Sequence, residues 1–157
     1  MKRNLLSIVA VAGVAYFFAA TGYAQDASKD IKVTPLLKTS TSWDAKALVY
    51  PQGKAEVTGI IVEIAPGGET GWHLHPVPCF GFMLEGDLDI SLKDGRVKRL
   101  HKGDVVAETV NTLHNGRNVG KVPVRILVFY TGIEGQVLTQ KEPLKTSAVA
   151  VKRKANP

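Results

Sequence analysis

The sequence predicts an all-β fold, built as a single small β-barrel or jelly roll. With 157 residues, the chain is long enough for one ordinary domain and too short for two. Its 15 glycines and 8 prolines supply many turn signals. Between residues 43 and 131, no apolar stripe with helical spacing is longer than two turns. Short alternating or β-branched runs occur instead, and they predict seven to ten strands.

The expected strands follow one another along the chain with turns between them. The runs are residues 47–50, 55–65, 72–75, 79–84, 88–92, 96–101, 105–107 and 123–130. The second run is rich in β-branched residues and ends at Pro66-Gly67-Gly68. Asp94-Gly95 is the strongest hairpin signal in the chain. The turn-forming pairs Asn111-Thr112 and Asn115-Gly116 flank His114, where no strand is assigned.

Residues 1–24 have the pattern of a signal peptide. Lys2 and Arg3 precede an apolar run of about 16 residues, which is shorter than the roughly 20 that a membrane-spanning helix needs. Small residues at Gly22 and Ala24 then occupy the positions that a signal peptidase recognises. We therefore expect cleavage after Ala24, a periplasmic or secreted protein, and no stable membrane anchor.

Two polar segments flank the predicted barrel. Residues 25–42 are interpreted as an N-terminal arm, residues 43–140 as the barrel, and residues 141–157 as a basic, disordered C-terminal tail. The formal net charge of the chain is +6, and a basic tail can bind nucleic acid. Export argues against nucleic acid as a partner. Cys79 is the only cysteine, so the exported chain has no internal disulfide.

His73 and His75 are spaced to bind one metal ion from a single strand. Residues i and i+2 of a strand point to the same face, so both imidazoles can converge on one point. Imidazole is a suitable ligand for zinc, copper, iron and nickel. A pair of this kind is a weak signal by itself, because two solvent-facing histidines give the same pattern.

The wider spacing resembles the two motifs of the cupin superfamily. The first motif has a glycine, His-X-His, a glutamate and a second glycine. It is matched by Gly67, His73, His75 and Gly86, with Cys79 in place of the glutamate. The second motif has a glycine, Pro-X-Gly, a histidine and an asparagine. It is matched by Gly103, Thr109-Val110-Asn111, His114 and Asn118. Neither motif contains an insertion, and the resemblance implies a cupin-type β-barrel over about residues 55–132.

The resemblance implies that His73, His75 and His114 hold one divalent transition metal ion. Zinc, copper and iron are expected first, with nickel and manganese as further candidates. Cys79 has three interpretations: a thiolate ligand, a neighbour of the site, or a small buried hydrophobe. Cysteine dioxygenases, which are relatives of cupins, have a cysteine here that is cross-linked to a tyrosine. Tyr50 and Tyr130 are therefore candidate neighbours of Cys79.

Two further departures from the motifs concern a turn and a carboxylate. The loss of Pro-X-Gly is mild, because Asn111 tolerates a left-handed backbone nearly as well as glycine does. Glu69, four residues before His73, is a candidate catalytic residue beside Cys79. It can replace the missing carboxylate or act as a general base. The alternative for Glu69 is an exposed loop charge.

These observations favour a metal-dependent enzyme of cupin type that acts on a small-molecule substrate, as an oxygenase, isomerase, lyase or decarboxylase. The alternative is a periplasmic protein that binds or senses a metal or a ligand without turnover. A structural cupin with little chemistry is the third hypothesis, since a fold does not fix a function. The resemblance also implies a homodimer, formed through sheet faces or through the N-terminal arm.

Overall fold

The computed structural model describes residues 30–143. The chain divides into two units, residues 1–34 and residues 35–157, and the sheets belong to the second unit. The predicted signal peptide and residues 144–157 of the predicted tail lie outside the described residues. Within residues 30–143, no helix is long and apolar enough to cross a membrane.

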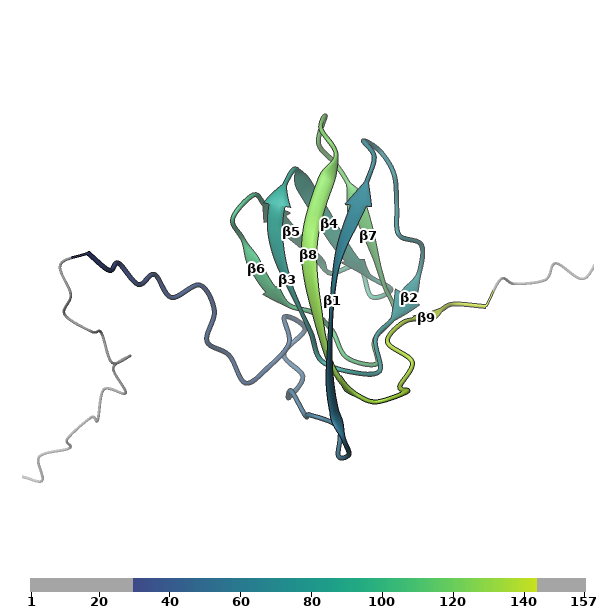
Figure 1. Cartoon of the computed structure of the whole chain (residues 1–157). Helices are drawn as coiled ribbons and strands as arrows, with labels where there is room; N and C mark the ends of the chain where they lie inside the picture. Colours follow the sequence, from purple (N-terminus) through teal and green to yellow (C-terminus); the bar gives the residue numbers. More distant parts are fainter. Residues whose placement is uncertain (1–29, 144–157) are drawn as a thin grey trace, which may run out of the picture. The chain divides into compact units, whose positions relative to one another are not determined.

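Nine strands form two antiparallel sheets in the described part of the chain (Figure 1). The strands are β1 (Ala55–Ile64), β2 (His73–Leu74), β3 (Cys79–Glu85), β4 (Asp87–Leu92), β5 (Val97–His101), β6 (Val105–Ala107), β7 (His114–Asn118), β8 (Val124–Ile133) and β9 (Gln140–Lys141). The order is β1-β8-β3-β6 in the four-stranded sheet and β5-β4-β7-β2-β9 in the five-stranded sheet. This arrangement confirms the predicted all-β class.

The core lies between the two sheets because apolar residues alternate along the strands. In β8, Val124, Ile126, Val128 and Tyr130 are buried, while the residues between them are half-buried or exposed. Burying one aliphatic side chain completely contributes roughly 1.5–3 kcal/mol to stability. A one-residue shift in register would turn the buried set of each strand outward, so the alternation fixes the pairing.

Residues 47–50 differ from the prediction, because they form no strand. Ala47 makes only an isolated bridge with Thr41. The amide of Leu48 donates to the carbonyl of Ser40 at 2.9 Å, so this segment pairs locally with the preceding residues. That local turn occupies the backbone groups that a sheet partner would need.

Residues 114–118 also differ, because they form strand β7 despite the turn-forming residues within and before them. The whole of β7 pairs with β4, and His114 also pairs with His73 of β2. A partner strand on each side outweighs the low strand propensity of asparagine and glycine. Gly116 faces inward, where an added Cβ would lie 3.3 Å from Thr70 and 3.4 Å from Leu88.

Three motif residues have structural roles around the site. Gly86 has φ +81°, and a Cβ there would lie 2.8 Å from the carbonyl oxygen of Pro123, so the turn requires glycine. Asn111 has φ 51°, as its position in the second motif predicted. The buried side chain of Asn118 donates to the carbonyls of Ile64 and Val122 at 2.8 Å each. It thereby ties the end of β7 to the end of β1.

Candidate metal centre

Three buried histidines face one another between the sheets. His73 in β2 and His114 in β7 are direct cross-strand partners, and His75 follows β2. Their ring centroids are 4.3 to 4.9 Å apart. One nitrogen from each ring lies within 4.8 Å of the others. The structure therefore brings together the three histidines that the motifs predicted.

Each of the three rings is held by a backbone carbonyl at Nδ1. These oxygens belong to Gly71, Leu138 and Thr112, at 2.7, 3.0 and 2.9 Å from Nδ1 of His73, His75 and His114, respectively. A carbonyl only accepts, so Nδ1 carries the proton and Nε2 of the neutral ring carries the lone pair. Histidines that bind metals are oriented by hydrogen bonds of this kind.

Glu108, which the sequence interpretation did not include, brings a carboxylate to the histidines. It lies directly after β6 and is 8% exposed. Its Oε2 is 3.2 Å from Nε2 of His75 and 3.3 Å from Nε2 of His114. Nε2 of His114 is buried and makes no well-directed hydrogen bond with the described residues. Imidazole nitrogens and a carboxylate oxygen that converge in this way are ligands that fit a divalent transition metal ion.

The electrostatics of the cluster follow from burial and from Glu108. Burial lowers the pKa of His73, which favours the neutral ring that binds metals. Burial also lowers the pKa of His114, but the nearby negative carboxylate of Glu108 outweighs it and raises that pKa overall. Burial would raise the pKa of Glu108, yet its contacts with His114 and His75 hold it below the usual range. The carboxylate is therefore ionised and attracts a cation.

Cys79 lies beside this carboxylate, on β3. Its side chain is fully buried, and Sγ is 3.6 Å from Oε2 of Glu108. Burial and the charge of Glu108 raise the pKa of the thiol, so Cys79 is the donor in this contact. Cys79, His75 and Glu108 form a second group with potential ligand atoms within 4.8 Å of one another. Tyr130 is the cross-strand partner of Cys79, whereas Tyr50 is 58% exposed.

Glu69 lies outside the histidine cluster. Its side chain is exposed, its Oε1 is 3.6 Å from Nη1 of Arg117, and its Oε2 accepts from Asn115 at 2.9 Å. The carboxylate that the structure places at the histidines is that of Glu108.

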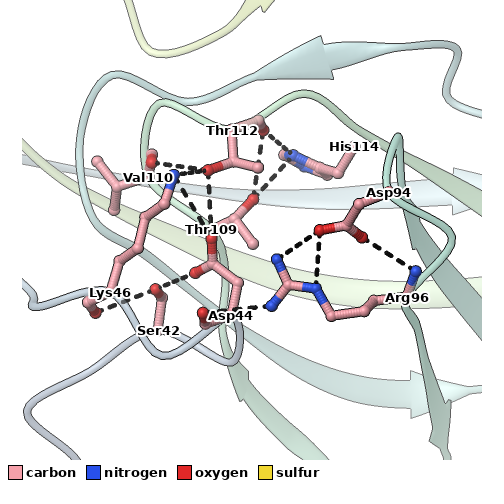
Figure 2. Close-up of polar contacts among 9 residues, drawn as sticks. All are labelled: Ser42, Asp44, Lys46, Asp94, Arg96, Thr109, Val110, Thr112 and His114. Carbon is pink, nitrogen blue, oxygen red and sulfur yellow. Dashed lines mark hydrogen bonds and ion pairs between the residues drawn. The ribbon is translucent and has the colours of Figure 1, made fainter.

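A buried polar network stands behind His114 (Figure 2). The hydroxyl of Thr112 donates to Oδ2 of Asp44 at 3.2 Å, and the carbonyl of the same threonine accepts from His114. Ser42 also donates to Asp44, and the ammonium of Lys46 is 3.7 Å from the Asp44 carboxylate. The segment that precedes the strands therefore helps to orient a candidate ligand.

The histidines line a cavity of about 230 Å³. Six of the residues that line it are aliphatic: Val62, Ile64, Leu88, Ile90, Ile126 and Val128. Thr70, Tyr130, Thr139 and Lys141 add polar groups, and Glu108 is the acidic residue that lines it. Sites for drug-sized molecules usually hold roughly 300–1,000 Å³, so this cavity suits a smaller molecule.

The fold and the donor set are those of a small β-barrel with a candidate metal site, and residues 60–130 match the family model described as a cupin domain. Residues 60–130 of the chain therefore form a domain of the cupin superfamily. The phomopsin biosynthesis cluster proteins C′ and D of Diaporthe leptostromiformis are each 34% identical to it over 71 residues. These alignments cover 45% of this chain and 37% of each relative, so the chain spans little more than a third of the curated relatives it matches.

Solved structures of other proteins also resemble the chain. A formate complex of oxalate decarboxylase from Lactobacillus farciminis has a TM-score of 0.48 and 22% identity, over 54% of this chain and 26% of that one. The DMSP lyase DddQ from Ruegeria pomeroyi also has a TM-score of 0.48 and 22% identity, over 54% of this chain and 42% of that one.

Proposed function

We propose that this chain is a metal-dependent enzyme that acts on a small molecule in the cavity beside the histidines. One observation carries the proposal. Three imidazole nitrogens converge at the wall of a mainly apolar cavity, and the carboxylate of Glu108 contacts two of the three rings, those of His75 and His114. A site for storage alone needs no cavity of this kind next to its ligands.

His73, His75, His114 and Glu108 would hold the ion, and each has a distinct task. The imidazoles bind as neutral donors fixed by backbone carbonyls. The charge of Glu108 offsets part of the charge of the ion. When bound, a divalent transition metal supplies Lewis acidity, which polarises a carbonyl or carboxylate of the bound molecule.

Other residues of the cavity control water and hydrogen bonding. Its aliphatic wall excludes water, which strengthens the electrostatic interactions inside. Burial raises the pKa of Tyr130, so its hydroxyl keeps its proton and can donate to an oxygen of the bound molecule. Oxygenase, isomerase, lyase and decarboxylase chemistry all suit such a site, and the choice among them depends on the substrate.

The identity of the ion forms part of the proposal. Three imidazoles and a carboxylate suit zinc, copper and iron, and also nickel and manganese. With Glu108 as the fourth donor, the ligands would be imidazole nitrogens and a carboxylate oxygen, with no thiolate from Cys79 to favour soft ions. If the chain is exported, as its first 24 residues predict, the usual affinity order favours copper or zinc.

The test compares the metal content and turnover of the wild type with those of three histidine variants. His73→Ala and His114→Ala should lose the bound metal and any turnover of a small molecule. His101→Ala is the matched control, because His101 is exposed and paired with Asp87. Tight metal uptake without turnover would indicate a binding or sensing protein instead. Failure of the wild type to bind a transition metal would overturn the proposal.

A further inference from the structure

The cavity combines a hydrocarbon wall with histidines and a lysine side chain. Its six aliphatic residues come from both sheets and face one another across the interior. Its volume of about 230 Å³ lies below the roughly 300–1,000 Å³ that is usual for sites of drug-sized molecules. A molecule that fills this space therefore has a short apolar body.

Lys141 lines this cavity with a positively charged side chain that is also exposed to solvent. It lies in β9, directly opposite His73 of β2, and direct cross-strand partners have their side chains on the same face of the sheet. Both residues line the cavity. Glu142, the next residue, points the other way and pairs with Lys93 at 2.8 Å.

Lys141 differs from neighbouring cations because it has no acidic partner in the described part of the chain. Lys93 is paired with Glu142, and Arg117 is paired with Glu69. Among the described residues, no carboxylate lies within ion-pair distance of the Lys141 ammonium. The only acidic residue that lines the cavity there is Glu108, which contacts His75 and His114.

The charges of the loaded site are therefore unbalanced. A divalent ion, neutral imidazoles and one ionised carboxylate leave a net charge of about +1 in a site where water is scarce. Lys141 adds a second positive charge. A bound carboxylate would balance part of this excess and form charge-assisted hydrogen bonds with the lysine.

We propose, on the basis of the proposed function, that the cavity takes a small monocarboxylate with an apolar body. Its carboxylate lies between the histidine cluster and Lys141, and its hydrocarbon part contacts the aliphatic wall. Lys141 is thus a residue that determines substrate specificity, and it distinguishes an acid from its neutral amide.

The test is isothermal titration calorimetry on the full chain, both loaded with zinc and stripped of metal. The probes are pentanoate, which matches the cavity in size, its neutral isostere pentanamide, and the polar dianion malonate. Pentanoate should bind the zinc-loaded chain at least about tenfold more tightly than pentanamide, because it alone forms a charge-assisted contact. Pentanoate should also bind more tightly than malonate, which has no hydrocarbon chain to contact the aliphatic wall.

Three variants assign the preference for the acid to Lys141. Lys141→Gln should abolish the preference while leaving zinc content unchanged, and Lys141→Arg should retain it. Lys121→Gln removes the same charge from an exposed loop outside the cavity and should have no effect. Equal binding of pentanoate and pentanamide, no pentanoate binding at millimolar concentration, tighter binding of malonate, or an unaffected Lys141→Gln variant would each overturn the inference. A chain that binds no zinc or other transition metal would instead overturn the proposed function.

Discussion

The five-stranded sheet and the four-stranded sheet bring different chemistry to the same cavity. The former supplies His73 and His114 from β2 and β7, and each ring is fixed by a backbone carbonyl. In the latter, Glu108 directly follows the edge strand β6 and lines the cavity, whereas Cys79 in β3 contacts the Glu108 carboxylate without lining the cavity. The contacts of the Glu108 carboxylate are with side chains: His75, His114 and Cys79.

This difference indicates that the histidine rings are preorganised by the backbone. The position of the Glu108 carboxylate depends instead on the side chains and the ion around it. Backbone carbonyls hold the rings in place whether or not an ion is present. The carboxylate is buried, ionised and adjacent to lone pairs, so it gains most from a bound cation. Removing the carboxylate charge should therefore affect metal affinity more than changes behind the rings.

The largest effect is expected for Glu108→Gln. This variant keeps the shape of the side chain and removes its charge, so metal affinity should fall by about 100-fold or more, measured by competition with a chelator. That loss matches or exceeds the roughly 10–100-fold cost of losing an outer hydrogen-bond partner. Glu69→Gln, an exposed carboxylate outside the cluster, is the control. A metal affinity of Glu108→Gln within threefold of the wild type would show that the carboxylate does not depend on the cation more than the histidine rings do.

An intermediate effect is expected for Asp44→Asn. Asp44 supports His114 through Thr112, so its loss should lower metal affinity by about tenfold, at the lower end of the range for outer partners. The same competition assay measures it. Asp89→Asn is the matched control, because Asp89 lies on β4 outside this network and pairs with Arg99. Equal losses of metal affinity in both variants would mean that the net charge of the protein, rather than this network, sets the affinity.

The smallest effect on metal affinity is expected for Cys79→Ala. If the thiol only donates to Glu108, affinity should change by less than threefold, while the free energy of unfolding falls by about 1 kcal/mol because a buried atom is lost. The cobalt-substituted wild type should then show no thiolate-to-cobalt charge-transfer band. Such a band, or an affinity loss as large as that of Glu108→Gln, would make Cys79 a ligand.

Local patterns predicted most of the fold and the histidine part of the site. Alternation and β-branched residues located strands β1, β3, β4 and β8, because burial on one face imposes that pattern. His73 and His75 could be matched to the first cupin motif because their spacing lies within one short segment. Strand β7 was missed because its asparagine and glycine have low strand propensity, and only its partners on both sides make it a strand.

Glu108 and Lys141 could not be found in this way because long-range pairing brings them to the site. Ala107 pairs with Phe80, and the amide of Glu108 donates to the carbonyl of Cys79, a register that local sequence does not encode. Lys141 was assigned to a disordered tail on composition. Its pairing with His73 joins residues far apart in the chain. The replacement for a missing motif carboxylate therefore has to be sought on neighbouring strands, not only on adjacent residues.

The contact between His75 and Leu138 has a consequence for synthesis. The ring receives its carbonyl partner from a residue 63 positions later, and β2 receives its edge strand from residues 140–141. A chain is made from its N-terminus onward, so the other two rings can find their partners while this side is still missing. The barrel stays open along β2 until these last residues emerge.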